Sequence, residues 1–499
     1  MAKPRPYLIP LLLFFISFIP RLLLLSQGPF HLDALNLAIQ SAETLRTHQL
    51  HFLFGSGYPL TVLLGTLFVW LSSLAGVDDP VRSVNLMSAF FGAFSTIALY
   101  MVGLKFFDRK TALLSALLFS LNPLVLTLST YGMGHMPALF FLLATIYFLS
   151  DPADVRRLLI AGFLSGLVGA SRIQDWLLML APLATLFFRP SGPANGPGGR
   201  SPREFLLRAF FIFTGLSGIV LFILHLPYIF QGPGYTGQVG TFFQLAITEN
   251  IRSIFSYSML VAGKYVVQIL SWPGTIVALA GMYLFSRENR HFARFLGLWI
   301  IVPFLFYGSL YTLSTRFLVI VLAPLALLQG YCLARLFSYG RIFRLSALLA
   351  LGTISCVNLA TVSPLLAFRH QHAPMSDFAR WVGQVTEPDA RVIAVDHCLF
   401  LQHYARRPCL YRPCNYFDNP QEALAQFRAS LDGLLRSGTP VYIITPGLYT
   451  YDPGQSFSSM MISHYQLIPV GERTVEEWYR AGIYPEFSEY TLYRILPKN

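Results

Sequence analysis

The chain has 499 residues, of which 54% are hydrophobic, 15% aromatic and only 12% charged. Because about a quarter of an average soluble domain is charged, this composition excludes a disordered chain and argues against a soluble enzyme. The net charge of +12 is typical of a membrane protein with basic cytoplasmic loops, and the absence of any run of five basic residues argues against nucleic acid as a partner.

A helix that crosses a bilayer needs about 20 largely apolar residues, and the first such stretch is 7–25. Lys3 and Arg5 precede it and no small-residue cleavage pattern follows it, so we predict a retained anchor with a cytoplasmic N-terminus. Further apolar stretches lie at 59–75, 84–104, 111–130, 137–150, 158–171, 175–188, 206–230, 259–285, 295–311, 317–337 and 343–368.

Basic residues predict which loops face the cytoplasm. All six basic clusters are cytoplasmic only if one apolar stretch before Lys105 does not cross. We assign that role to 59–75, which has an acidic flank and no basic one, and expect it to lie against the outer leaflet. This assignment predicts eleven spans, with the first loop at 26–83 and the C-terminus outside. The alternative of twelve spans would place basic clusters outside at several loops, against the positive-inside rule. The clusters are Lys3 and Arg5; Lys105, Arg109 and Lys110; Arg156 and Arg157; Arg189, Arg200, Arg203 and Arg208; Arg287, Arg290 and Arg294; and Arg335, Arg341 and Arg344.

The chain changes character after residue 368. Residues 391–396 and 440–445 have the pattern of buried strands, and 420–436 has apolar residues at helical spacing. Strand, helix and strand in this order indicate a parallel pair. The predicted fold class is therefore an all-α polytopic membrane domain of about eleven transmembrane helices at 1–368, followed by a small extracytoplasmic α/β domain at 369–499.

The five cysteines form no CxxC pair. Cys332 and Cys356 lie in apolar runs and are interpreted as packing residues. Cys398, Cys409 and Cys414 lie in the polar C-terminal part, where an oxidising compartment would allow one disulfide. The spacing does not decide which two of the three would pair.

Several catalytic motifs are absent from the sequence, including GxxxxGK[ST], HExxH and GxSxG. The charges of the apolar part sit at span ends, whereas a secondary transporter usually carries ionisable groups at mid-span. Asp33 lies eight residues beyond the first span, in the predicted outer loop. An Asp before an apolar helical stretch suits an N-cap, which is compatible with a second role only if its carboxylate is partly free.

Basic residues at predicted outer positions are candidates for binding an anion. Arg316 lies at the outer end of a span, where the charge rule disfavours arginine, although snorkelling to the headgroups would also explain it. Lys264 lies within an apolar segment, where an ammonium group needs a partner such as a phosphate. Arg172 is a third candidate, with pairing to Asp175 as the alternative.

The order of several short motifs resembles the GT-C superfamily of polyprenyl-phosphate-sugar glycosyltransferases. The chain is most similar to the group of protein O-mannosyltransferases and lipid A aminoarabinose transferases. The resemblance covers about 1–340 and extends to the outer C-terminal domain. It is carried by an early Asp in the outer loop, Gly-Tyr-Pro-Leu at 57–60, Pro-Val-Arg-Ser-Val-Asn at 80–85, Phe-Phe-Asp-Arg-Lys at 106–110, Leu-Asn-Pro at 121–123, Ala-Gly-Phe-Leu-Ser-Gly-Leu-Val-Gly-Ala-Ser-Arg at 161–172, and Thr-Arg-Phe-Leu-Val-Ile-Val-Leu-Ala-Pro at 315–324.

The resemblance implies that Asp33 is the catalytic carboxylate and that Arg316 contacts the donor phosphate. The family often has Asp-Glu where this chain has Asp33-Ala34, and often an acidic residue where it has His135. A divalent metal is allowed, with Asp33 and His135 as candidate ligands, but no cofactor is firmly implied. Residues expected near the acceptor or in a supporting position are His31, Tyr58, Tyr131, His135 and Tyr311.

The predicted function is an integral-membrane inverting glycosyltransferase of the cell envelope, located in the plasma (inner) membrane. Its partners would be a polyprenyl-phosphate-linked sugar, a lipid, glycan or protein acceptor, and membrane lipids, without nucleic acid. Two other classes stay open. A transporter or flippase for a lipid-linked sugar predicts polar groups deep in several spans, and a non-catalytic scaffold predicts no basic residues at outer span ends.

Overall fold

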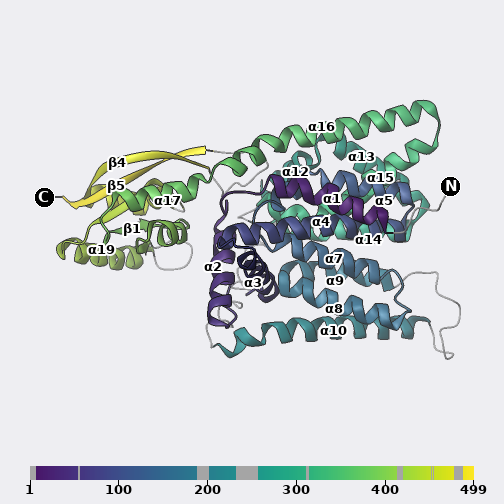
Figure 1. The fold of residues 1–499 in the computed structure, drawn as a ribbon, viewed down its shortest axis with the longest axis horizontal. Helices are drawn as coiled ribbons and strands as arrows, with labels where there is room; N and C mark the ends of the chain where they lie inside the picture. Colours follow the sequence, from purple (N-terminus) through teal and green to yellow (C-terminus); the bar gives the residue numbers. More distant parts are fainter. Residues whose placement is uncertain are drawn as a thin grey trace. The chain divides into compact units, whose positions relative to one another are not determined.

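The computed structural model describes residues 7–53, 57–187, 202–231, 257–310, 314–412, 420–450, 452, 454–476 and 487–498. They form two compact units, seen in Figure 1. The helical unit comprises 7–26 and the described residues of 37–370, and the C-terminal unit comprises 27–36 together with the described residues after 370. The sequence-based domain division at 368/369 stays a prediction, and it did not include 27–36 with the C-terminal residues.

The helical unit is built from helices, most of which are labelled in Figure 1. They are α1 (Leu8–Leu23), α2 (Leu32–Thr47, whose first residues belong to the C-terminal unit), α3 (Pro59–Leu74), α4 (Pro80–Phe106), α5 (Arg109–Ser120), α6 (Pro123–Leu128), α7 (His135–Phe148), α8 (Val155–Ser171), α9 (Ile173–Phe187), α10 (Pro202–Phe230), α12 (Tyr257–Leu270), α13 (Trp272–Glu288), α14 (Arg290–Gly308), the short turn η1 (Thr315–Leu318), α15 (Val319–Ser338) and α16 (Arg341–Gln371).

Polar caps determine where several of these helices begin. The side chains of Asp79, Asp108, Asn122 and Asp154 each accept two backbone N–H groups of the following turn. Proline follows Asn122 directly, in the first helical position, where its missing N–H costs nothing. The predicted span 111–130 is therefore divided into α5 and α6.

The predicted count of eleven spans is not confirmed. Among the described residues, five helices are long and apolar enough to cross a membrane, or six if the bent pair α12 and α13 is one span. The helices α1, α3, α7 and α9 are apolar but shorter. The five segments are Pro80–Phe106, Leu206–Phe230, Arg290–Gly308, Thr315–Ser338 and Arg341–Val385.

A sharp bend divides the predicted span 259–285. The axes of α12 and α13 differ by 100°, and Ser271 between them has a φ of +62°. Backbone groups freed by such a break must find other partners inside a membrane. Here the side-chain amide of Asn122 donates to the carbonyl of Ile269, in the last turn of α12, at 2.9 Å.

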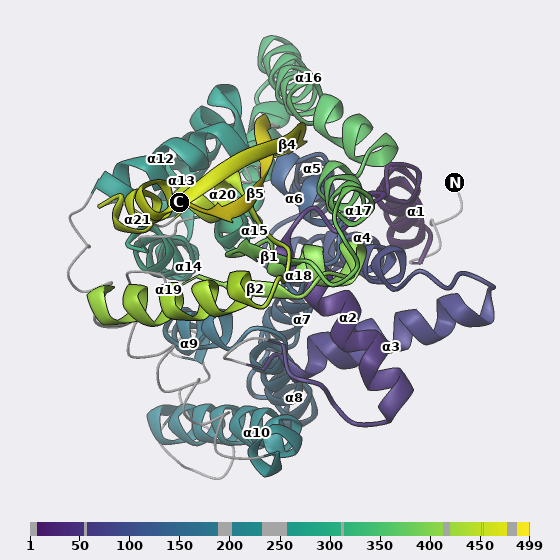
Figure 2. The ribbon, with the colours of Figure 1, turned by 90° about the vertical axis from the view of Figure 1, so that its left-hand side faces the viewer.

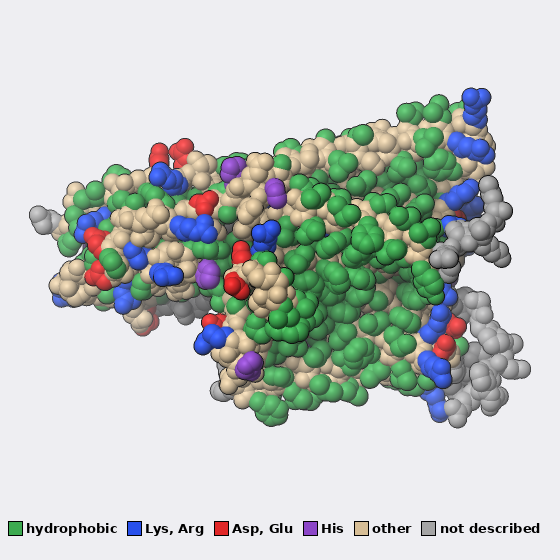
Figure 3. Space-filling model, viewed as in Figure 1, with side chains coloured by type: hydrophobic (Ala, Val, Ile, Leu, Met, Phe, Trp, Pro, Cys, Tyr) green, Lys and Arg blue, Asp and Glu red, His purple; other side chains and the backbone are tan. Residues whose placement is uncertain are grey.

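The surface of the helical unit matches a membrane environment. Figure 3 shows hydrophobic side chains over most of its flank and Lys and Arg gathered at one end. Helix ends that carry basic residues meet there: Lys105 is in the last turn of α4, Arg109 begins α5, Arg335 is in the last turn of α15 and Arg341 begins α16. The positive-inside rule would place this end in the cytoplasm, and the orientation stays a prediction.

The C-terminal unit contains a five-stranded sheet with the order β2-β1-β3-β5-β4. The strands are β1 (Arg391–Ala394), β2 (Cys409–Tyr411), β3 (Val441–Ile444), β4 (Tyr465–Glu476) and β5 (Phe487–Pro497). β1 pairs in parallel with β3, with Val392 opposite Tyr442, and α19 (Pro420–Arg436) precedes β3. The predicted parallel pair and its helix are confirmed, whereas β2 and the long antiparallel pair of β4 and β5 were not predicted.

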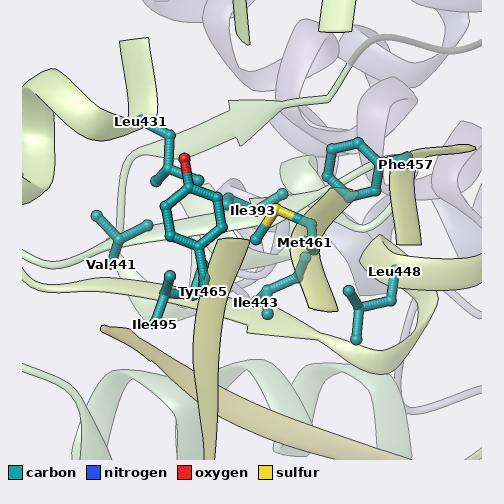
Figure 4. Close-up of a cluster of buried hydrophobic side chains, with 9 residues drawn as sticks. All are labelled: Ile393, Leu431, Val441, Ile443, Leu448, Phe457, Met461, Tyr465 and Ile495. Carbon is teal, nitrogen blue, oxygen red and sulfur yellow. The ribbon is translucent and has the colours of Figure 1, made fainter. Parts of the chain in front are cut away.

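Helices cover both faces of this sheet, and Figure 2 shows the strands between α17 and α19. The helices are α17 (Pro374–Val385), α18 (Cys398–Phe400), η2 (Leu401–Ala405), α19, α20 (Thr445–Tyr449) and α21 (Ser456–His464). On one face Ile393, Ile443 and Ile495 pack against Leu431 and Phe457, as seen in Figure 4. Because side chains alternate along a strand, Tyr490 lies on the other face, where it contacts Phe378 of α17.

A disulfide joins Cys398 and Cys409, with their Cα atoms 5.3 Å apart. It connects the short helix α18 to the edge strand β2, which pairs with β1. Cys414 lies outside the described residues, while Cys332 and Cys356 are free. Of the pairings that the sequence left open, the structure therefore contains the one between Cys398 and Cys409.

Candidate active site

The turn between α8 and α9 carries a buried ion pair. Arg172 follows the last residue of α8, and its Nε lies 2.9 Å from Oδ2 of Asp175, in the first turn of α9. The other carboxylate oxygen, Oδ1, accepts a short hydrogen bond from the hydroxyl of Tyr307, at the end of α14. All three side chains are buried, so the group depends on its internal contacts rather than on water.

Phe317 in η1 contacts this group and Arg316 together. The Phe317 ring stacks on Tyr307 with centroids 5.2 Å apart and an angle of 17° between the planes. The guanidinium carbon of Arg172 lies 5.8 Å from the ring centroid of Phe317, and that of Arg316 lies 5.0 Å from it. The structure thus brings together two of the three predicted cations, on one aromatic ring.

His135 and Tyr58 extend the same neighbourhood. The His135 ring is nearly parallel to Phe317, with centroids 6.3 Å apart. Tyr58, half-buried before α3, accepts a hydrogen bond of 2.5 Å from the amide of Gln174, two residues after Arg172. A Cβ at Gly134 would lie only 2.8 Å from Oγ1 of Thr61, so the turn that leads to His135 requires glycine where it meets α3.

Other predicted residues of the helical unit lie elsewhere. Lys264 is exposed on α12, and within the described part of the chain it forms no ion pair. Tyr131 is buried, with the guanidinium carbon of Arg369 5.5 Å from its ring centroid. Tyr311 lies outside the described residues.

Asp33 and His31 belong to the C-terminal unit. Nδ1 of His31 accepts the backbone N–H of Asp33 at 2.9 Å and also lies 3.5 Å from Oδ1 of Asp33. His31 therefore receives one of the N–H groups that a helix start leaves unpaired, while Asp33 lies within the first turn of α2. The structure does not place Asp33 in the N-cap position, and its side chain is 28% exposed.

The sequence suggested Asp33 and His135 as candidate ligands of a divalent metal. These two residues belong to different units, and within the described ranges no group of three or more His, Cys, Asp or Glu side chains could hold a metal ion. Asp33 has His31 beside it, with Nδ1 of His31 3.5 Å from Oδ1 of Asp33. The described residues thus do not form the ligand set that a divalent metal requires, and no reaction step is assigned to one.

The sequence did not predict roles for Tyr307 and Phe317. Both are aromatic residues at the ends of apolar runs, where aromatic side chains are common and carry no specific signal. The position of Phe317 next to Arg316 was the available hint. Only the packing of α14 against α9 shows that Tyr307 reaches Asp175.

A family model matches residues 63–195, and its description is dolichyl-phosphate-mannose-protein mannosyltransferase. No match was found among curated proteins. The matched segment contains α4 to α9, including Arg172 and Asp175.

Solved structures of membrane glycosyltransferases share the fold. ArnT from Cupriavidus metallidurans, bound to undecaprenyl phosphate, has a TM-score of 0.59 and 15% identity, over 97% of this chain and 96% of that one. The oligosaccharyltransferase AglB from Archaeoglobus fulgidus, in complex with an inhibitory peptide and a dolichol-phosphate, has a TM-score of 0.59 and 13% identity, over 88% and 70%. The arabinofuranosyltransferase AftD from Mycobacteria has a TM-score of 0.53 and 15% identity, over 100% and 42%.

Proposed function

We propose that the chain is a member of the GT-C superfamily of polyprenyl-phosphate-sugar glycosyltransferases and an inverting enzyme that acts on the outer face of the membrane, in line with the family-model match at 63–195 and the fold shared with ArnT and AglB. It moves a sugar from a polyprenyl-phosphate donor to a hydroxyl or amine acceptor. The observation that carries the proposal is the guanidinium group of Arg316 on the ring of Phe317, at the start of the apolar segment Thr315–Ser338. Fixed cations at the end of a span suit a lipid-linked phosphate.

Arg316 is proposed as the main contact of the donor phosphate. When the sugar leaves, a negative charge develops on the phosphate oxygen, and a cation held in place at a low-dielectric site stabilises that charge strongly. A guanidinium group can offer two parallel N–H donors to a phosphate. Lys264 is the second proposed phosphate contact, since its exposed ammonium group is accessible to a headgroup.

Asp33 is proposed as the general base. Its carboxylate removes the proton from the acceptor as the acceptor oxygen or nitrogen attacks the anomeric carbon. The bond from that carbon to the phosphate oxygen breaks, and its electron pair stays on the polyprenyl phosphate. One displacement of this kind inverts the anomeric centre, and general-base assistance contributes about two to four powers of ten in rate.

The proposed location is the plasma membrane, with the N-terminus inside and the C-terminal unit outside. The basic helix ends at one end of the helical unit support this orientation. The disulfide between Cys398 and Cys409 supports an oxidising compartment for the C-terminal unit. The acceptor is proposed to be a lipid, glycan or protein, in line with the inhibitory peptide in the AglB complex.

The test is an assay of the purified full chain with a panel of polyprenyl-phosphate sugars. Release of polyprenyl phosphate by the wild type, with loss of release in Asp33→Asn, is the expected result. A transporter or flippase would instead move intact lipid-linked sugar across proteoliposomes without breaking the glycosidic bond. Movement of intact donor without release for every sugar in the panel would refute the proposed reaction.

A further inference from the structure

Phe317 is the point where four side chains of the candidate site meet. Its ring contacts Tyr307 and His135 by near-parallel stacking and lies within cation–π distance of Arg172 and Arg316. These partners come from four different parts of the chain, namely α7, the end of α8, α14 and η1. A ring held by so many elements has little freedom to rotate.

Phe317 contacts a buried chain of interacting side chains that consists of Tyr307, Asp175 and Arg172. Arg172 binds one oxygen of Asp175, the hydroxyl of Tyr307 binds the other, and the ring of Tyr307 lies on Phe317. Asp175 is thus bound on both oxygens, and it holds Arg172 and Tyr307 in one geometry. The charge of Arg172 is compensated by Asp175, so we assign Arg172 no direct contact with the donor phosphate.

We propose that Phe317 is a positioning residue: its ring, fixed by Tyr307 and the Arg172–Asp175 pair, holds the guanidinium group of Arg316 in the orientation that meets the donor phosphate. This inference rests on the phosphate role proposed for Arg316. The ring face attracts the guanidinium plane, because the electron density of an aromatic ring is negative above the ring. Arg316 is thereby oriented before the donor arrives, which lowers the entropy cost of binding.

The expected size of the effect follows from the contact. A partly buried cation–π contact changes an equilibrium by roughly two- to thirtyfold. Phe317→Leu, which removes the ring but keeps an apolar side chain, should weaken the affinity for polyprenyl phosphate about tenfold, with a similar fall in kcat/KM for the donor. Phe317→Tyr keeps the ring and should restore most of both quantities.

The experiment measures the affinity of purified full-length variants for polyprenyl phosphate in detergent, without turnover, beside donor kinetics. Phe306→Leu is the matched control: Phe306 also contacts the Tyr307 ring, at 5.3 Å, from the preceding position of α14. It should keep wild-type affinity. Thermal unfolding of each variant separates a local effect from misfolding, and Phe317→Met serves as a second ring-free variant if Phe317→Leu does not fold.

A double-mutant comparison shows whether Phe317 acts through Arg316. In the Arg316→Ala background, Phe317→Leu should cause no further loss of affinity, because the group that it positions is gone. Additive losses, or wild-type affinity in Phe317→Leu while Arg316→Ala is impaired, would overturn the positioning role. If instead the wild type turns over no polyprenyl-phosphate sugar, the proposed function fails, and that result is independent of the affinity measurements.

Discussion

At the scale of single residues, the structure separates groups that the sequence had treated alike. Arg172 and Arg316 were both predicted as phosphate contacts, but Arg172 forms a buried ion pair with Asp175. For Asp33 the sequence left open a catalytic carboxylate or a helix N-cap. The structure places His31 rather than Asp33 directly before α2. Each difference leads to a substitution with a distinct expected outcome.

Asp33→Asn should lower transfer by at least about a hundredfold while the protein stays folded, because an amide cannot accept the acceptor's proton. The substitution is nearly isosteric, so packing changes little. Glu43→Gln is the matched control, since it makes the same change on an exposed residue of the same helix and should leave the rate unchanged. Chelator treatment of the wild type tests whether Asp33 instead acts through a metal. Undiminished turnover in Asp33→Asn would remove Asp33 from the catalytic residues.

Arg316→Ala should weaken donor use far more than it lowers the thermal unfolding temperature. Arg316→Lys should also be impaired, because an ammonium group cannot form two parallel bonds to a phosphate. Donor kinetics of both variants, beside thermal unfolding curves, provide the comparison. Normal turnover in Arg316→Lys would contradict a bidentate contact.

Asp175→Asn should destabilise the helical unit by about 3–5 kcal/mol, because it leaves the buried guanidinium of Arg172 without its counter-ion. Glu43→Gln again provides the control, since its ion pair with Arg46 has the same i,i+3 spacing but is exposed and should contribute little. Thermal or denaturant unfolding in detergent measures both variants. Equal stability of the two would show that burial of the Arg172–Asp175 pair has no energetic consequence.

At the scale of helices, capping residues and breaks decide how the apolar stretches are used. α5 ends at Ser120 with Leu121 as its C-cap, and Asn122 caps the next helix, so a predicted span becomes α5 and α6. Ser271 separates α12 from α13 by a bend of 100°. Hydropathy alone cannot detect such divisions, because residues on both sides of a break remain apolar.

The orientation prediction belongs to this scale. Single-cysteine variants at positions 110 and 290 should be labelled only from the cytoplasmic side, and those at 57 and 450 only from the outside. Cys332, Cys356 and Cys414 are replaced beforehand to remove background labelling, while Cys398 and Cys409 stay joined in their disulfide. Position 200, outside the described residues, should also be cytoplasmic, and labelling it from the outside would overturn the topology. The segment 59–75 contains the 16-residue helix α3 and is expected not to span the membrane. The labelling sides of positions 57 and 110 test this expectation.

At the scale of the whole molecule, the two units differ in what stabilises them. Tight helix packing with few buried charges forms the helical unit, whereas the C-terminal unit is a covered sheet with a disulfide. The interior of the C-terminal unit also contains His397, whose Nε2 lies 3.1 Å from the Tyr490 hydroxyl. Burial lowers the pKa of His397 to about 3, since the charged imidazolium would lose its hydration.

The low pKa of His397 predicts that acid destabilises the C-terminal unit. An unfolded histidine binds a proton near pH 6.5, so between about pH 6.5 and 3 the unfolded chain binds more protons than the folded one. The stability is therefore complete above about pH 6.5 and falls as the pH is lowered, by roughly 2–3 kcal/mol at about pH 4.5. Hydrogen exchange of β1 and β3, corrected for intrinsic rates, measures this loss. The variant His397→Gln should lack this part of the pH dependence, and an identical acid response in wild type and variant would contradict the assignment to His397.

The sequence by itself determined the features that depend on composition and local period. Low charge and long apolar stretches indicated a helical membrane protein, and the pattern at 391–396, 420–436 and 440–445 predicted the strand, helix and strand that the structure contains. The order of short motifs resembles the GT-C superfamily, and solved glycosyltransferase structures share the fold of the chain. These features can be recognised in the sequence because each depends on residues that are close together along the chain.

Only the tertiary structure decided which residues act together. The pairing of Cys398 with Cys409, the contact of Tyr307 with Asp175 and the shared ring of Phe317 join positions that are up to 182 residues apart. Contacts of this kind depend on how helices pack, and an aromatic or acidic residue at a helix end has the same local pattern whether or not it reaches such a partner. The physical reason is that packing geometry is set by the whole set of helices, whereas a sequence pattern records only the preference of each helix for its own environment.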